Sequence, residues 1–242
     1  MAFLHGKGTR IMVAQYDVSA YFSGADVDST ATSHDVTTLG KNTVQRAAGL
    51  HDGKAALSGL FDATADALLA GWLGSSAGEA FTICPGGDSA GGPAEIGKIQ
   101  QVGYKTSQPV GGMVAASLTI EAKTDWEPNG KVLHVLGAET ETGAEASVDN
   151  SASSANGGIA SIHCTTVTGT DPTLDSKIQH SANDSEWADF DPSAAFTQLT
   201  AAGSETITIA AGTTVNQYVR EYHTVGGTNT PTFTYLVAFA RR

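Results

Sequence analysis

Residues 53–62, GKAALSGLFD, run directly into residues 63–74, ATADALLAGWLG, and this junction decides the fold. The first part alternates small apolar and polar positions, as a strand does. Asp62 is a good helix N-cap, because its carboxylate accepts hydrogen bonds from the first free backbone amides. Gly74 suits the left-handed residue that ends a helix. The sequence therefore predicts a strand followed by a helix at 62–73, which is expected to pack through Leu68, Leu69 and Trp72.

Almost everything else in the chain has the two-residue period of β-strands or reads as loop. The cleanest pattern lies in residues 112–124, whose apolar face consists of Val114, Ala116, Leu118, Ile120 and Ala122. A turn is expected at 126–130, WEPNG, because Pro, Asn and Gly favour turns. Further strands are predicted at residues 13–22, 80–84, 98–106, 159–167, 174–181, 205–210, 214–225 and 232–240. The predicted fold class is mainly β with one α-helix.

The segment from residue 23 to residue 52 is polar and has no clear pattern. Roughly 30 residues of irregular backbone are far more than a compact domain usually contains in one loop. We therefore expect a long loop at 23–52 that pairs with something outside this chain, or that holds a short strand near residues 36–39.

A second polar stretch, residues 137–158, is rich in Gly, Ala, Ser and Glu and is the best candidate for a flexible linker. It divides the chain into a first domain at 1–136 and a second at 159–242. The second part contains strand patterns and turn signals but no helix pattern, as in a β-sandwich. We expect it to be a separable domain and not a duplicate of the first.

The composition excludes several classes of function. The chain has 242 residues, of which 25 are acidic and 13 basic, and its formal net charge is −12. Clustered Lys and Arg are missing, so tight nucleic-acid binding is not expected. The two cysteines, Cys84 and Cys164, are far apart and are expected to be small buried residues. No signal-peptide core or long apolar run is visible, so synthesis in a host cytoplasm is expected.

Two serine motifs resemble hydrolase signatures but lack the required context. Residues 87–93, GDSAGGP, insert Ala90 into the spacing of a chymotrypsin-type signature, and residues 74–78, GSSAG, follow a helix where a nucleophile elbow follows a strand. The seven histidines are scattered, without metal-site spacing, although folding can gather distant ones. Residues 26–37 lack the Gly and Glu of a calcium loop. We expect no enzyme activity, no cofactor and no metal site.

Two regions resemble the tail tube, or major tail, proteins of long-tailed phages. In the first, residues 17–22, DVSAYF, lead through the polar segment to residues 49–62, in the order strand, long loop, strand and helix. The second begins with IQHSANDSEW at residues 178–187, continues through NQYVR at 216–220 and ends in the strand at 233–242. This second region is similar to the C-terminal β domain of some tail tube proteins.

The resemblance implies a virion protein with a tail-tube-type β-sandwich or barrel and one α-helix, followed by a C-terminal all-β sandwich. Its copies are expected to join edge to edge into rings, usually of six subunits, that stack into a tube. DNA passes through the lumen without specific binding, and the second domain decorates the outside. The implied partners are further copies of the chain, the tape measure protein, and tail tip or terminator proteins, with no membrane. The strand pattern at 98–106 and 112–124 gives the expected lumen-lining residues, Thr119, Glu121, Lys123 and Gln101. Alternatively, Glu121 pairs with a lysine on the outer surface.

Other functions remain open from the sequence. The chain is alternatively a capsid decoration or baseplate protein of the same virion. A third possibility is a glycan-binding module at 159–242, in which sugars stack on Trp187, Tyr218 and Tyr222. Burial of these three rings in the core is the competing interpretation.

Overall fold

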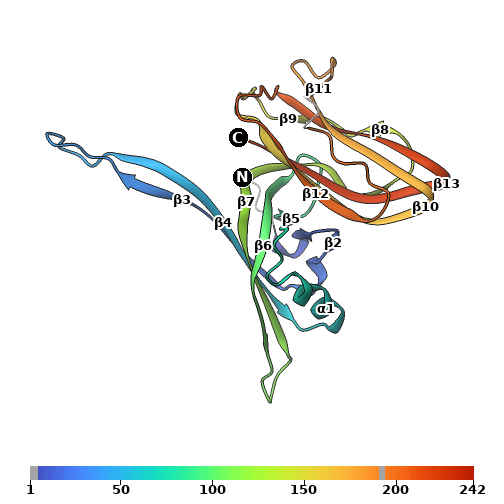
Figure 1. The fold of residues 1–242 in the computed structure, drawn as a ribbon, viewed down its shortest axis with the longest axis horizontal. Coiled ribbons are helices and arrows are strands. Elements are labelled where there is room, and N and C mark those ends of the chain that lie inside the picture. The colour runs from blue at the N-terminus through green and yellow to red at the C-terminus, as the bar shows by residue number, and fades with distance from the viewer. Residues whose placement is uncertain (1–4, 191–193) are drawn as a thin grey trace.

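The computed structural model describes residues 5–190 and 194–242 (Figure 1). These residues form one large antiparallel sheet with one α-helix, which confirms the predicted fold class. The helical elements are η1 (Gly6–Gly8), η2 (Ser19–Tyr21) and α1 (Ala63–Trp72). The strands are β1 (Arg10–Val13), β2 (Tyr16–Asp17), β3 (Gly24–Asp35), β4 (Arg46–Leu60), β5 (Glu79–Cys84), β6 (Pro93–Ser107), β7 (Ala115–Glu139), β8 (Gly143–Ala144), β9 (Val148–Asp149), β10 (Gly158–Ser181), β11 (Ala188–Asp189), β12 (Gly203–Ile209) and β13 (Tyr218–Arg241).

Helix α1 lies where the sequence predicts it. The Asp62 carboxylate accepts hydrogen bonds from the backbone amides of Thr64, at 2.9 Å, and Ala65, at 3.1 Å. Gly74 has a φ of 76°, the left-handed conformation that glycine adopts without strain. The helix covers one face of the sheet made by β4, β7 and β6, and its buried residues join a cluster with Leu57, Leu118 and Ile120.

The segment expected to be an irregular loop is instead a β-hairpin. Strand β3 pairs with β4 from Gly24↔Ser58 to Asp35↔Arg46, with one register shift between Ala31 and Ser33. Figure 1 shows the two strands leaving the body of the protein as a long projection, which we call the arm (residues 24–60). The prediction of a loop at 23–52 was therefore wrong in its secondary structure.

Several strands that the sequence divides are continuous or differently divided. Strand β7 passes straight through the turn expected at 126–130, and β10 and β13 each include 24 residues. Register shifts between Cys164 and Thr173 absorb the Gly and Pro residues that suggested a break, because a β-bulge accommodates an extra residue. The strand expected at 13–22 is split into β1, β2 and η2.

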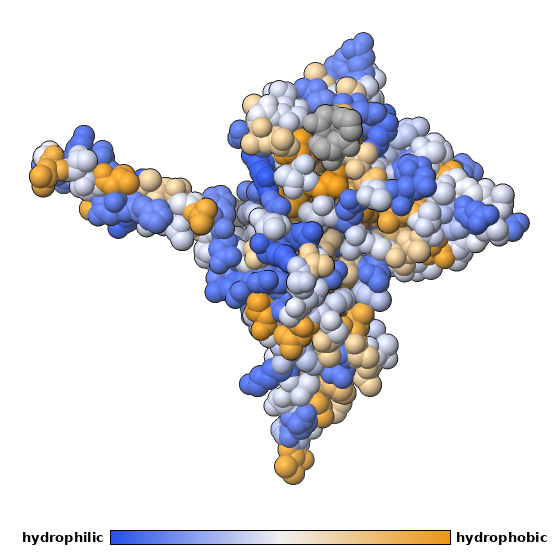
Figure 2. Space-filling view, in the orientation of Figure 1, coloured by the Kyte–Doolittle hydropathy of each residue, from blue (hydrophilic) through white to orange (hydrophobic). Residues whose placement is uncertain are grey.

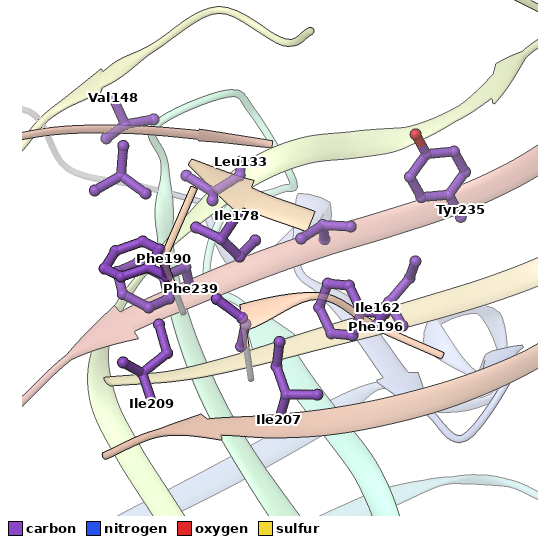
Figure 3. Packing of buried hydrophobic residues seen from close by; sticks show 14 of the residues in the cluster. Leu133, Val148, Ile162, Ile178, Phe190, Phe196, Ile207, Ile209, Tyr235 and Phe239 are labelled. Carbon is purple, nitrogen blue, oxygen red and sulfur yellow. The ribbon is translucent and has the colours of Figure 1, made fainter. Parts of the chain in front are cut away.

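The second half of the chain is built on the β10–β13 ribbon. Figure 1 shows this ribbon folding back on itself, so that its two halves face each other. Between them lies the largest apolar cluster, to which β7 contributes Leu133 (Figure 3). The stretch expected to be a flexible linker lies against the ribbon, because β8 and β9 both pair with β13 and Val148 is buried in the cluster.

The two halves of the chain also share a core. A third cluster combines Met12, Ile96 and Val132 with Ile159 and residues of β13. Strand β7 pairs with β13 from Gly130↔Ala240 to Glu139↔Phe233. Both cysteines are free and buried, as the sequence predicts. Among the described residues, no helix combines the length and the apolar character that crossing a membrane requires.

Candidate assembly surfaces

The outer part of the arm has no core from its own chain. From Asp28 to Thr43 every residue is exposed, and the facing part of β4 is exposed up to Asp52 apart from a half-exposed Gly49. Over this length β3 and β4 pair with each other alone, among the described residues. The tip is closed by hydrogen bonds from the Val36 amide to the Gln45 carbonyl and from the Gln45 amide to Thr37 Oγ1, at 2.9 and 2.8 Å. Local bonds thus define the hairpin, but no packing supports it.

The base of the arm is fixed by Trp126 of β7. Its indole lies against Gly53, where an added Cβ would be 2.1 Å from the ring. The indole Nε1 donates a hydrogen bond to Ser29 Oγ at 2.8 Å, which joins the ring to β3. The ring also stacks on Phe81, with 5.3 Å between centroids. Burial raises the pKa of the neighbouring Glu95 carboxyl, although hydrogen bonds from Ser29 and Trp126 oppose the shift. The contacts of Trp126 in the core therefore fix the direction in which the arm leaves the body.

Apolar side chains are exposed along the arm and at a second tip. Figure 2 shows orange patches along the arm and at the far end of the β6–β7 hairpin. Leu39 at the arm tip is fully exposed, and Leu50 on β4 is 82% exposed. Val36 and Val44 are exposed near the arm tip as well, and Val110 and Met113 are exposed at the tip of the β6–β7 hairpin. Such clusters on projecting hairpins are typical of surfaces that a partner covers.

The open face of β4, β7 and β6 carries most of the residues expected to line a lumen. Glu121 pairs in register with Lys54 on one side and Gln100 on the other, and Thr119 lies two residues along on the same face. Both Glu121 and Thr119 are exposed. Lys123 is half-buried and donates a hydrogen bond to the Ser76 carbonyl. This face is polar and has both signs of charge.

Gln101 does not belong to that face. It is 5% exposed, and its side-chain amide has no hydrogen-bond partner among the described residues. Neighbouring residues of a strand point to opposite faces, so Gln100 and Gln101 cannot both be on the open side. After the register shift between Gln101 and Gly103, the open face continues with Gly103, which pairs with Thr119. The assignment of Gln101 to an exposed lumen face is wrong for this subunit.

The three helix residues that were expected to pack contact the apolar cluster that includes Leu57, Leu118 and Ile120. Leu69 is buried, and Leu68 and Trp72 are partly buried against the same cluster. The Trp72 ring lies 5.9 Å from that of Tyr16, centroid to centroid. The helix is also tied to β6, because Tyr104 Oη donates to Asp66 Oδ1 at 2.6 Å. Burial, followed by the bond and charge of Asp66, raises the pKa of Tyr104 to about 12.

The aromatic residues considered for glycan binding are half-buried and lie beside cations. The Arg220 guanidinium carbon lies 4.1 Å from the centre of the Trp187 ring, and Lys177 Nζ lies 5.3 Å from that of Tyr222. Each cation covers one ring face. Tyr218 is half-buried as well and pairs with Asp149 of β9.

One group of polar residues was not anticipated from the sequence. His134, Glu145 and His223 come together in the second half of the chain, where one ligand atom from each lies within 4.8 Å of the others. They are 11 and 78 residues apart along the chain, so no local spacing reveals them. The strand pairings β7–β13 and β13–β8 bring them together.

No family model matches the sequence, and no curated protein matches it. Among solved structures, the chain is similar to one in the virion of a native gene transfer agent particle, at 16% identity over 51% of this chain and 97% of the other, with a TM-score of 0.43. It is similar to the SPP1 tail tube at 14% identity over 49% and 75%, with a TM-score of 0.39. It is also similar to the SPP1 Dit protein, described as a hub adsorption apparatus of phages infecting Gram-positive bacteria, at 9% identity over 96% and 99%, with a TM-score of 0.38. These likenesses concern the fold alone.

Proposed function

We propose that this chain is a non-enzymatic structural subunit of a phage tail, and that its copies assemble through the arm into rings that stack into a tube. The observation that carries the proposal is the arm. An isolated two-stranded hairpin is marginally stable in water at best, because it buries little apolar surface. The outer arm nevertheless forms a paired ladder from Thr30↔Asp52 to Asp35↔Arg46, interrupted by one register shift. A neighbouring molecule that packs on it supplies the missing core.

A second copy of this chain is the partner that fits best. The arm projects away from the body, so it reaches a neighbour and not its own sheet (Figure 1). When each copy gives an arm to the next, the contacts are head-to-tail, and such contacts close into a ring if the rotation allows. Ring closure also covers strand edges that invite uncontrolled pairing. The edges in question belong to β3 and β12, each of which pairs with a single strand among the described residues.

The open face of β4, β7 and β6 is our candidate for the lumen wall. It carries Glu121, Lys54 and Thr119, and the chain as a whole has a net charge of −12. A wall without a basic cluster lets DNA pass, since retention of DNA requires clustered cations. In this arrangement the second half of the chain lies outside the tube, and the tape measure and tail tip proteins contact the assembled rings.

Shortening the arm tests the proposal directly. Thr30 and Asp52 are paired, so residues 31–51 can be replaced by Asn-Gly, which closes a two-residue hairpin turn. The variant keeps the buried residues Ala55 and Leu57 and should retain the thermal unfolding profile of the full chain. We expect the full chain to form rings or tubes in electron micrographs and the shortened variant to stay monomeric by light scattering. Rings of normal diameter from the shortened variant would show that the arm is not the assembly element.

A further inference from the structure

A buried group of ionisable residues in the second half of the chain plays no part in the proposed assembly. His134 comes from β7, Glu139 from the end of β7, Glu145 follows β8, and Glu221 and His223 come from β13. We call these five residues the His–Glu cluster. Glu221 is fully buried, and His134 is 1% exposed. Ionisable groups are expensive to bury unless they are paired or hold a metal ion.

The surroundings of His134 determine which of its ring nitrogens carries the proton. Nδ1 lies 3.1 Å from the backbone carbonyl of Tyr235, and a carbonyl can only accept, so Nδ1 is the donor. In the neutral ring, Nε2 then carries a lone pair. It is buried and has no hydrogen-bond partner among the described residues. Its nearest ionic neighbours are carboxylate oxygens of Glu139, at 3.4 Å, and Glu145, at 3.6 Å. A lone pair that faces two carboxylate oxygens is unfavourable unless a positive charge lies between them, either a metal ion or a second proton on the ring.

His223 is oriented toward the same point. Its Nδ1 lies 2.9 Å from Glu221 Oε2, and Glu221 Oε1 accepts a 2.6 Å hydrogen bond from Ser176. Nδ1–H therefore donates to the Glu221 carboxylate, and this bond orients the ring so that Nε2 faces the cluster, 3.9 Å from Glu139 Oε2. Metal-binding histidines usually have this second contact, in which the other ring nitrogen donates to a carboxylate or a carbonyl. Both histidines of the cluster have it.

We propose that the His–Glu cluster binds one Zn²⁺ ion, with His134 Nε2, His223 Nε2 and a Glu145 oxygen as ligands and Glu139 at the fourth position. Two imidazoles with carboxylates form a ligand set that suits Zn²⁺, whereas Ca²⁺ and Mg²⁺ prefer oxygen ligands alone. The ligand atoms of His134, Glu145 and His223 lie within 4.8 Å of one another, and zinc–ligand distances of about 2.0–2.2 Å require them to move somewhat closer together. Glu145 lies outside a strand and is partly exposed, so its side chain can make this movement.

The ion would act as a structural clamp. Its ligands come from β7, from the stretch after β8 and from β13. Without the ion, these three segments are connected only by the β7–β13 ladder and by the two-residue strands β8 and β9, among the described residues. The charge of the ion offsets the three carboxylates gathered around the two rings. The segment 137–158 would thus be fixed to the ribbon by coordination as well as by strand pairing.

The test uses the full chain after treatment with a chelator, titrated separately with Zn²⁺ and Co²⁺. We expect one ion per chain by calorimetry, a visible Co²⁺ spectrum of four-coordinate type, and a rise in Tm of roughly 5–10 °C at a hundredfold excess of Zn²⁺ over Kd. Glu145→Gln keeps the shape of a partly exposed side chain and should weaken Zn²⁺ binding by about tenfold or more.

A matched control is the double variant His34→Gln/His51→Gln, which removes two exposed imidazoles from the arm. It should bind Zn²⁺ as the unmodified chain does. The proposal is overturned if the chelator-treated chain shows neither Co²⁺ absorption nor a Zn²⁺-dependent Tm. It is also overturned if the arm variant loses binding while Glu145→Gln retains it, since the ion then sits on the surface. A buried imidazolium in place of the metal would produce the first of these results.

Discussion

The assembly proposal makes its sharpest prediction at two leucines of the arm. Leu39 is fully exposed and Leu50 is 82% exposed, so neither contributes packing to the isolated subunit. Replacing both by Ser should change the unfolding free energy of the monomer by no more than about 0.5 kcal/mol. If the neighbouring copy buries both leucines, each substitution removes about 1.5–3 kcal/mol of favourable burial energy from one inter-subunit contact. The pair then weakens association by about 3–6 kcal/mol, or roughly 10²- to 10⁴-fold.

The assay measures the protein concentration at which rings or tubes appear, by light scattering and sedimentation, together with the Tm of the monomer. Leu39→Met/Leu50→Met is the control, because it preserves apolar volume and should assemble almost normally. Assembly of the Ser variant at the normal concentration would refute the burial of these leucines. A large fall in its monomer Tm would show instead that the arm packs on its own subunit.

Three further predictions concern the body of the subunit. Asp62→Ala removes the cap of α1 and should lower the free energy of urea unfolding by about 1 kcal/mol, with Asp62→Asn losing less. His163 donates to the Ala14 carbonyl and contacts Thr82, and burial lowers its pKa from 6.5 to about 4. The unfolded chain therefore binds the proton first, and stability should fall by about 3 kcal/mol as the pH drops from 6.5 to 4. This loss should be absent from His163→Gln when the two pH profiles of unfolding free energy are compared. Glu121→Lys should leave assembly intact but slow DNA release through the tube at low salt, with Glu121→Gln intermediate.

Each of these has an outcome that contradicts it. An unchanged urea midpoint in Asp62→Ala would mean that packing alone holds the helix. Parallel pH profiles for the unmodified chain and His163→Gln would place the pH dependence on other groups. Unchanged DNA release from Glu121→Lys tubes at low salt would move this residue to the outer surface.

The helix could be predicted because its signals are local. Asp62 at the start, Gly74 at the end and an apolar stripe between them lie within one short segment, and each depends on neighbours a few residues away. The burial of alternate residues in β7, such as Leu118 and Ile120, could also be predicted, from the two-residue apolar period of the sequence. In both cases one face of the element is buried by the same chain, and this produces the periodic pattern in the sequence.

The arm could not be recognised for the opposite reason. A strand alternates apolar and polar residues when one face is buried, but both faces of the outer arm are exposed in this subunit. Its sequence therefore reads as a polar loop, although its backbone forms a two-stranded ladder. The missing pattern is itself informative, because the surface that would impose it belongs to another molecule in our proposal.

The remaining errors come from long-range pairing. Gln101 is buried because it pairs with Ile120 on the core face of β7, and the sequence of β6 alone does not reveal this partner. The Gly and Pro residues near 168–173 and 226–231 suggest turns, yet they face each other across the β10–β13 ribbon as bulges. The His–Glu cluster likewise requires three segments to be paired before its residues meet.

The position of β13 in the sheet also determines the order in which strands can pair while the chain is being synthesised. The core that the two halves share has the same effect. Strand β13 lies between β10 and β7 and holds β8 and β9 as well. Residues 218–241 must therefore leave the ribosome before β8 and β9 have a strand to pair with and before the end of β7 gains its β13 partner, and until then Met12 and Ile96 lack part of their cover. Pairing between strands so distant in the chain is slow. The arm, a local hairpin, can form while the body is still incomplete, so in the assembly that we propose a nascent chain forms the element that joins a neighbour before it completes the surface that receives one.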